Sequence, residues 1–194
     1  MYGHSAYKST LDPGGRPGAT LDRVAGKTDI FDLGRLQLSS GQARRVDLLV
    51  ELEGLEFGGQ RYVPQTRMTE SVLDASRTTS GYSLRLRFHA RLQGPCMRCL
   101  EYADTPISID AREIDQPGGG EDMRSPYVGG DELDVRSWAR DALALALPAQ
   151  IVCREDCRGL CAICGENLNE AGPDHVHERA PDPRFAKLSE LRLE

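Results

Sequence analysis

The sequence lacks a long hydrophobic run. Its longest uninterrupted apolar stretch extends from Ala142 to Ala149, a run of eight residues that includes Pro148. A membrane-spanning helix needs about 20 apolar residues, so we do not expect an integral membrane protein. Residues 1–30 also lack the apolar segment of an ordinary secretory signal. We therefore expect the protein to be cytoplasmic.

The chain has no excess of basic residues and none of the common catalytic motifs. Lysine and arginine together number 24, against 30 aspartate and glutamate residues, which gives a formal charge of −6 over 194 residues. Bulk charge therefore does not favour nucleic-acid binding, and any such contact would need a local basic surface. The motifs H-E-x-x-H, G-x-S-x-G, G-x-G-x-x-G and the P-loop are missing, so we do not expect an enzyme.

Composition divides the chain into an arm and a domain. Residues 1–28 contain five glycines and two prolines but few large apolar side chains. Such a segment buries too little surface to offset the entropy lost on ordering. We expect a disordered N-terminal arm over residues 1–28 and a single domain over residues 29–194.

Residues 83–93 give the clearest periodicity in the chain. Apolar and polar residues alternate strictly here over eleven positions, which predicts a half-buried antiparallel strand. The apolar residues are Leu84, Leu86, Phe88, Ala90 and Leu92. The run at 46–52 and the alternation at 105–114 predict further strands, with shorter ones near 61–63 and 68–75.

A helix is expected after residue 134. Asp134 can cap it, and an apolar stripe follows at helical spacing until Pro148 ends the pattern. A shorter helix is expected over residues 182–192. The predicted fold is therefore α+β: a mainly antiparallel β-sheet, one central helix, a zinc-binding cysteine-rich loop and a short C-terminal helix.

Six cysteines and two histidines follow a spacing typical of metal ligands. The motif C-x2-C at 96–99 is followed by cysteines in the segment 153–177, which ends in H-x-H. The candidate ligands are Cys96, Cys99, Cys153, Cys157, Cys161, Cys164, His175 and His177. In a cytosolic chain, clustered cysteines favour metal over disulfides, and tetrahedral Zn²⁺ takes four such ligands.

Eight ligands are enough for two zinc ions, but the spacing alone leaves their division open. The preferred division places the first four cysteines at one site and Cys161, Cys164, His175 and His177 at the other. A single site made of the four cysteines between 153 and 164 is an alternative, and so is a ribbon joining 96–99 to 161–164. Glycine after the second cysteine of a turn, as at Gly165, lets the backbone turn back toward the sulfurs.

The role expected for zinc is structural, because no catalytic zinc motif is present and closed sites contribute folding energy. Two alternatives remain: a redox-sensing zinc regulator and a thiol-dependent enzyme. A thioredoxin-like role for residues 96–99 is disfavoured, because the following segment is too short for the helix that such a motif requires.

The polar side of the strand at 83–93 carries a row of basic residues. Arg85, Arg87, His89 and Arg91 lie on this side, and Arg98 follows the strand. Side chains two residues apart stand about 7 Å from each other, a spacing that suits neighbouring phosphates, and arginine favours phosphate contacts. These four arginines are candidate RNA or partner contacts. The alternative is a solvated strand face paired with acids such as Asp110 or Glu113.

Several segments together resemble the YceD family of large ribosomal RNA subunit accumulation proteins. They are C-M-R-C-L-E at 96–101, the helix ending in L-A-L-P at 145–148, the string from Cys153 to Asn169, and D-P-R-F-A-K-L at 182–188. The resemblance covers residues 29–192. Related sequences often carry C-x-C after the N-L-N at 167–169, where this chain has His175-x-His177, and this supports the histidines as ligands.

The resemblance implies a bacterial, cytoplasmic, non-enzymatic factor. Members support accumulation of the 23S ribosomal RNA and hence assembly of the large ribosomal subunit. The partner would be precursor ribosomal RNA or a large-subunit ribosomal protein, with one or two Zn²⁺ ions as cofactor. No membrane partner and no small-molecule substrate are expected.

Overall fold

The computed structural model describes residues 22–177, with the side chains described from residue 27 onward. The predicted C-terminal helix at 182–192 and most of the predicted arm lie outside this range. The chain divides into two compact units. Their described parts are 22–52, 66–90 and 108–146 in unit 1, and 53–65, 91–107 and 147–177 in unit 2.

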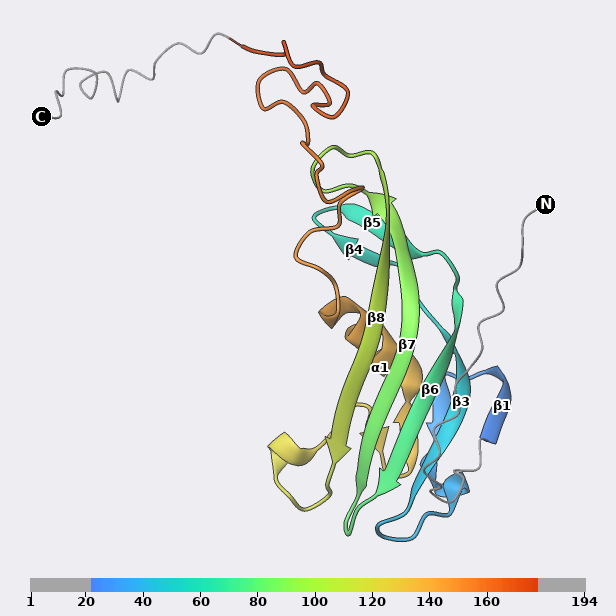
Figure 1. Cartoon of the computed structure of the whole chain (residues 1–194). Coiled ribbons are helices and arrows are strands. Elements are labelled where there is room, and N and C mark those ends of the chain that lie inside the picture. The colour runs from blue at the N-terminus through green and yellow to red at the C-terminus, as the bar shows by residue number, and fades with distance from the viewer. Residues whose placement is uncertain (1–21, 178–194) are drawn as a thin grey trace, which may run out of the picture. The chain divides into compact units, whose positions relative to one another are not determined.

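Antiparallel strands form the sheet of unit 1 (Figure 1). Strand β3 (Ala43–Glu51) pairs with β6 (Met68–Arg77), and β6 pairs with β7 (Tyr82–Pro95). Strand β8 (Tyr102–Asp115) pairs with β7. Strand β1 (Asp22–Lys27) lies parallel to β3. The apolar residues of β7 named above are all buried, so the strand predicted from the alternation is confirmed.

A small second sheet of unit 1 consists of β2 (Ile30–Asp32), β10 (Glu132–Asp134) and β9 (Val128–Gly129). Two 3₁₀ turns, η1 (Leu33–Leu36) and η2 (Glu121–Met123), belong to the same unit.

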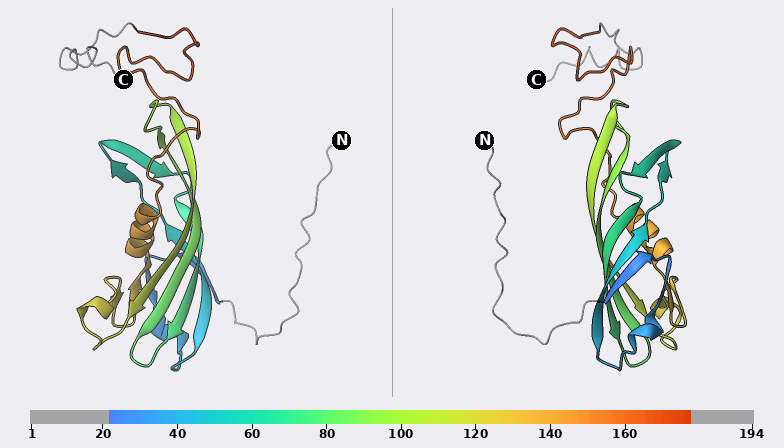
Figure 2. Two further views of the ribbon diagram at one scale, coloured as in Figure 1. Left: turned by 60° about the vertical axis from the view of Figure 1, so that its left-hand side comes forward. Right: turned by 90° about the vertical axis from the view of Figure 1, so that its right-hand side faces the viewer.

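The one helix in the described residues is α1 (Val135–Leu145), and it begins where the sequence predicted. The Asp134 carboxylate accepts a hydrogen bond from the Ser137 N–H at 2.9 Å and so caps the helix. Val135, Trp138 and Leu143 bury the apolar stripe. Figure 2 shows α1 on one face of the unit 1 sheet, where it covers the apolar side of the strands.

Unit 2 has little regular structure. Strands β4 (Leu55–Phe57) and β5 (Gln60–Pro64) form a hairpin, and Val63 and Pro64 pair with the end of β7. One cluster of buried residues in this unit consists of Tyr62, Cys96, Cys99, Ala103, Ile151 and Cys157. Half of this cluster is cysteine, and Leu55, Leu92 and Ile107 are buried elsewhere in the unit.

The expected and observed architectures agree in class: the structure is mostly antiparallel sheet with one helix. One boundary differs. The segment Asp22–Lys27 is a strand although it falls within the predicted arm, because its backbone pairs with β3. The single domain from residue 29 onward stays a prediction, and the chain forms two compact units. Apolar periodicity does not mark this division, because the alternations at 83–93 and 105–114 cross the boundaries between the units.

Candidate metal centres

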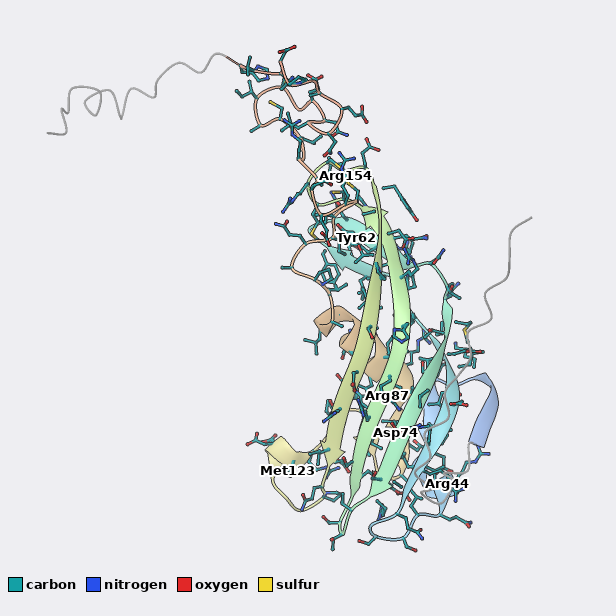
Figure 3. The ribbon with its side chains drawn as sticks, viewed as in Figure 1. Arg44, Tyr62, Asp74, Arg87, Met123 and Arg154 are labelled. Atoms are coloured by element: carbon teal, nitrogen blue, oxygen red, sulfur yellow. The ribbon has the colours of Figure 1, made fainter. Side chains whose placement is uncertain are left out.

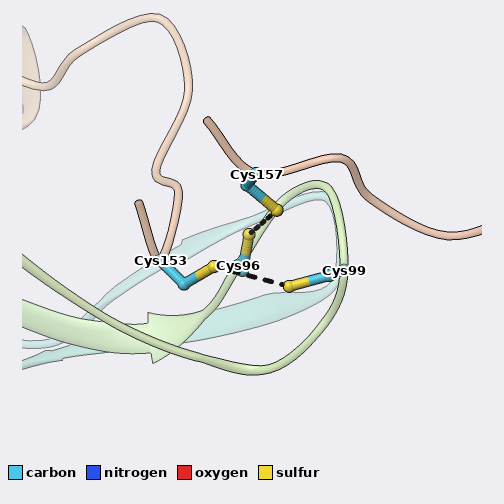
Figure 4. Close-up of side chains that lie close together, drawn as sticks. All are labelled: Cys96, Cys99, Cys153 and Cys157. Atoms are coloured by element: carbon cyan, nitrogen blue, oxygen red, sulfur yellow. Dashed lines mark hydrogen bonds between the residues drawn. The ribbon is translucent and has the colours of Figure 1, made fainter. Parts of the chain in front are cut away.

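Four cysteines meet in the core of unit 2 and form the first cluster. Cys96, Cys99, Cys153 and Cys157 place their sulfurs within 4.8 Å of one another. The Cys96 and Cys157 sulfurs are 3.8 Å apart, and those of Cys99 and Cys153 are 3.6 Å apart (Figure 4). Three of the four residues are buried, with Cys96 fully so. Segments more than fifty residues apart in the sequence therefore converge on one point.

These separations match a metal centre and not a disulfide. A disulfide needs sulfurs about 2.05 Å apart, and all six cysteines are free thiols. Four sulfurs held tetrahedrally at about 2.3 Å from Zn²⁺ would be about 3.8 Å from one another. The first cluster therefore has the dimensions of a four-sulfur zinc site.

The second cluster, also in unit 2, consists of Cys161, Cys164, His175 and His177, again with ligand atoms within 4.8 Å of one another. The Cys164 sulfur is 3.6 Å from His175 Nε2, which is 3.2 Å from His177 Nε2. A tetrahedral zinc would set these pairs at about 3.6 Å and about 3.3 Å. The other ring nitrogen of His175, Nδ1, is 2.9 Å from the Glu166 carboxylate, an arrangement that orients histidine ligands in metal sites.

The structure thus gathers the eight candidate residues into the two groups of the preferred division. The single site made of the four cysteines from 153 to 164, and the ribbon joining 96–99 to 161–164, are not the groups that form. Both clusters could hold a metal ion, and in both the candidate ligand atoms belong to side chains.

The turn at 96–99 is shaped by two backbone hydrogen bonds. The Cys96 N–H donates to the Glu101 carbonyl at 2.6 Å, and the Leu100 N–H donates to the Cys96 carbonyl at 3.0 Å. Leu100 follows the second cysteine with φ of 64°, a left-handed conformation that costs a non-glycine residue energy. The chain thereby folds back over the sulfurs.

The turn at 161–164 repeats this pattern. The Cys161 N–H donates to the Glu166 carbonyl, and the Gly165 N–H donates to the Cys161 carbonyl, both at 2.8 Å. Gly165 has φ of 76°, as its expected role in turning the backbone requires. The two C-x2-C turns are therefore equivalent structures in different parts of unit 2.

Two side chains near the clusters have roles that the sequence analysis did not assign. The Asn169 side-chain NH2 group donates to the Cys157 sulfur at 3.5 Å, and its side-chain oxygen Oδ1 accepts from the Arg158 backbone N–H at 2.8 Å. Glu166 contacts His175 as described above. The only sequence signal was their place in the string that resembles the YceD family, because no spacing rule identifies residues that support ligands.

Hydrogen bonding and burial separate the pKa values of the first cluster. Burial opposes ionisation of Cys96, but the backbone N–H groups of Cys99 and Arg98 lower the pKa of its thiol to about 6. For Cys153, burial and the neighbouring thiols raise the pKa to about 12. Burial also raises the pKa of Cys99, whereas hydrogen bonds, chiefly from the Asn169 side chain, outweigh burial and lower the pKa of Cys157. The values diverge in part because adjacent thiolates repel one another. A divalent cation would relieve that repulsion.

In the second cluster, a hydrogen bond with His175 and the backbone N–H groups of Cys164 and Ile163 lower the pKa of Cys161 to about 6. The same contact with Cys161 raises the pKa of His175. This cluster is the more exposed of the two.

The predicted basic face lies on β7, and its arginines are paired. Each of the three strand arginines forms an ion pair with an aspartate of a neighbouring strand. The pairs are Arg85–Asp110 at 2.5 Å, Arg87–Asp74 at 2.6 Å and Arg91–Asp104 at 3.0 Å. Figure 3 shows Asp74 and Arg87 side by side on β6 and β7. The arrangement matches the alternative in which acids neutralise this face.

Arg98 instead connects the two loops of the first cluster. Its guanidinium donates to the Cys157 carbonyl and to the Gln150 side chain, both at 3.0 Å. Its backbone N–H donates to the Cys96 sulfur at 3.4 Å, and its carbonyl accepts from the Leu160 N–H at 3.1 Å. Arg98 therefore contributes to the shape of this site.

No helix within residues 22–177 is both long enough and apolar enough to cross a membrane. No solved structure matches the chain. Curated relatives include the uncharacterized protein Rv2926c of Mycobacterium tuberculosis, which is 36% identical over 104 residues, 50% of this chain and 49% of that protein. The uncharacterized protein ML1660 of Mycobacterium leprae is 32% identical over 103 residues, 50% of this chain and 46% of that protein. The chain thus spans about half the length of these relatives.

A plant relative matches a longer part of the chain. The large ribosomal RNA subunit accumulation protein YCED homolog 1, chloroplastic, of Zea mays is 26% identical over 184 residues, 78% of this chain and 59% of that protein. The model of the family described as large ribosomal RNA subunit accumulation protein YceD matches residues 84–192. That range is more than half of the chain and contains both clusters. The chain belongs to the YceD family.

Proposed function

We propose that this protein is a non-enzymatic, zinc-stabilised binding module that supports accumulation of 23S ribosomal RNA and assembly of the large ribosomal subunit in the bacterial cytoplasm. The observation that carries the proposal is the family match over residues 84–192, which includes every residue of both clusters. The proposed partner is precursor ribosomal RNA or a large-subunit ribosomal protein.

Zinc is the proposed metal, with one ion in each cluster. Four thiolates, or two thiolates with two imidazoles, are the donor sets of structural zinc sites, and the separations fit its bond lengths. The Asn169 amide on Cys157 and the Glu166 carboxylate on His175 supply the supporting contacts that such ligands usually have.

The geometry of the clusters supports a structural role. A catalytic zinc keeps one coordination position open for water or substrate. Each cluster here offers four side chains to one point, which would fill a tetrahedral ion. The ions would then contribute to the folding of unit 2 and hold its loops in the shape that a partner recognises.

The charges of the described residues indicate which kind of partner is favoured. A phosphate approaching Arg85, Arg87 or Arg91 must compete with an aspartate already in contact. Residues 131–170 contain four arginines and eight acidic residues. This balance favours a basic protein partner over direct RNA binding in that region.

Two measurements test the proposal. Cells lacking the protein should show a lower ratio of 23S to 16S ribosomal RNA, which the wild-type gene restores and the Cys96→Ser variant does not. Metal analysis of reduced, purified protein should find two zinc ions per chain. An unchanged RNA ratio would refute the role in accumulation, and protein without zinc would refute the metal.

For the basic face, we compare a triple variant, Arg85, Arg87 and Arg91→Glu, with the wild type in salt-dependent RNA binding. Equal binding would exclude this face as the RNA site.

A further inference from the structure

One short segment of unit 2 joins the two clusters. Cys157 is the last ligand of the first cluster, and Cys161, four residues later, is the first ligand of the second. Residues 157–169 therefore lead from one cluster through the C-x2-C turn of the other. A change in the position of this segment reaches ligands of both clusters.

The segment closes into a hairpin around the second C-x2-C turn. Leu160 and Asn167 form an antiparallel bridge, and the Leu168 N–H donates to the Gly159 carbonyl at 2.9 Å. These contacts form the base of the hairpin, and the turn at 161–164 lies beyond it. The position of the base therefore determines where the two cysteines of the second cluster lie.

The base of the hairpin rests on the turn of the first cluster. The Leu160 N–H donates to the carbonyl of Arg98 at 3.1 Å, and Arg98 lies between the ligands Cys96 and Cys99 in the sequence. Gly159 has φ of 77°, and a Cβ at this position would lie 3.1 Å from the same carbonyl oxygen. The backbone of the hairpin thus packs directly on the first turn, at a position that favours glycine.

Asn169 forms the second connection between the hairpin and the first cluster. Its side-chain NH2 group donates to the Cys157 sulfur at 3.5 Å. Its side-chain oxygen accepts from the Arg158 backbone N–H at 2.8 Å, and Asn167 Oδ1 accepts from its NH2 group at 2.8 Å. These contacts hold the amide with a donor toward the sulfur. Hydrogen bonds to a metal ligand orient it, and their loss typically lowers metal affinity about 10–100-fold.

We propose that Asn169 is a positioning residue that couples the two metal centres. A filled second cluster holds residues 161–177 in place and keeps the Asn169 amide on Cys157. A filled first cluster holds Cys157 and the turn at 96–99, on which the hairpin base rests. Each ion therefore raises the affinity of the protein for the other, and linkage requires the same factor in both directions. The inference rests on the metal-binding part of the proposed function and not on the role in ribosome assembly.

The test is a cobalt titration of the full-length protein, reduced and freed of metal. Cobalt(II) is the probe because its visible absorption differs between a four-sulfur site and a site of two sulfurs and two nitrogens, so each cluster is followed separately. We expect Asn169→Ala to weaken cobalt binding at the first cluster about tenfold or more. Glu170→Ala is the matched control, because Glu170 is the exposed neighbour of Asn169, and it should bind as the wild type does.

A second substitution separates the hydrogen bond from the shape of the loop. Asn169→Asp keeps the size of the side chain and an oxygen that accepts from Arg158, but it has no N–H to donate to Cys157. We therefore expect it to weaken cobalt binding at the first cluster at least as much as Asn169→Ala does. First-cluster affinity equal to that of the wild type would show that only the loop shape matters and would overturn the proposal.

A double-mutant cycle measures the coupling itself. Cys164→Ser removes a ligand of the second cluster and should weaken cobalt binding at the first cluster several-fold when Asn169 is present. At saturating metal the first cluster stays filled, so the change is one of affinity. In the Asn169→Ala background the same change should have no further effect. Equal weakening in both backgrounds, or none in either, would overturn the proposal.

Failure of this inference and failure of the proposed function are separately visible. Two clusters that bind cobalt independently would refute the coupling alone. Protein that binds no metal would refute the zinc proposal and the coupling together. The ratio of 23S to 16S ribosomal RNA in cells tests only the role in accumulation.

Discussion

Removing the proposed zinc ions should unfold unit 2 and leave unit 1 folded. Around the first cluster, unit 2 buries two large apolar residues besides its cysteines, Tyr62 and Ile151. Leu55, Leu92 and Ile107 are also buried in this unit. Full burial of such a side chain contributes about 1.5–3 kcal/mol. A structural zinc site binds with about 10–16 kcal/mol at neutral pH. Two such metal sites together therefore exceed the contribution of the five buried apolar side chains, and without metal the thiolates of the first cluster also repel one another.

Unit 1 has its own core and no residue of either cluster. Leu73, Leu84, Leu86 and Trp138 are almost fully buried there without any contribution from the cysteines. Its sheet and helix α1 should therefore survive chelation. We therefore expect loss of the metal to unfold unit 2 alone.

The assay is an NMR spectrum of reduced protein before and after a strong chelator. The amides of Ala103 and Ile151 report on unit 2, and those of Leu84 and Leu86 report on unit 1. We expect the amide signals of Ala103 and Ile151 to lose their dispersed chemical shifts and those of Leu84 and Leu86 to keep them. Restored dispersion on adding Zn²⁺ shows that the loss is reversible.

Two cysteine variants separate the clusters. Cys96→Ser removes a buried ligand of the first cluster and should reproduce the effect of chelation. Cys164→Ser removes an exposed ligand of the second cluster and should disturb residues 161–177 alone. The reasoning is refuted if metal-free protein keeps unit 2 folded, or if unit 1 unfolds together with it.

Three further predictions concern single positions. Leu100→Gly should leave the free energy of unfolding unchanged or raise it by up to about 1 kcal/mol, because relief of the left-handed strain offsets the greater backbone entropy of glycine in the unfolded chain. Leu100→Val should lower the free energy of unfolding. Thermal unfolding measures both. Gly81→Ala should destabilise the protein by at least about 3 kcal/mol in urea unfolding, because the new Cβ would collide with the Asp115 carbonyl. Arg85→Gln should raise the pKa of Asp110, which its contact with Arg85 lowers, in an NMR titration of the carboxyl carbon. With the pair intact, its contribution to stability is present above the unfolded pKa of about 4 and is lost as pH falls through the folded value.

Matched controls accompany two of these. Gly129→Ala should cost little, because a Cβ at Gly129 meets open space. Arg112→Gln should raise the pKa of Asp110 less than Arg85→Gln does, because Arg112 acts on Asp110 through charge alone. A Gly81→Ala protein as stable as the wild type, or an Asp110 pKa unmoved by Arg85→Gln, would contradict the structure.

Local patterns predicted unit 1 well, because its elements are periodic. The alternation at 83–93 and the capped stripe after Asp134 correspond to β7 and α1. Strand β1 was not predicted. Its ordering depends on parallel pairing with β3, and pairing between separate segments leaves no periodic signal in either one.

Most of unit 2 could be predicted only through the chemistry of its ligands, although the strand expected near 61–63 corresponds to β5. Spacing identified the candidate metal ligands, and their number suggested two sets of four. The spacing does not decide how the ligands divide between two sites, because that depends on which distant turns the fold brings together. Arg98 illustrates the limit. Its sequence position beyond a row of arginines suggested an RNA contact, which stays a prediction, and the structure adds that its guanidinium donates hydrogen bonds to Gln150 and Cys157 beside the first cluster.

The two C-x2-C turns help to give unit 2 its shape. Each turn is closed by the same pair of backbone hydrogen bonds, which set the backbone positions of its two cysteines. The first turn belongs to the segment between β7 and β8, and Cys153 and Cys157 come to it from beyond α1. The second turn takes its partners from the next few residues of the chain. Zinc at the first cluster would therefore close a long-range contact and create the core of unit 2, whereas zinc at the second would order a local loop. The first ion should accordingly dominate folding, and the second should be the more readily lost.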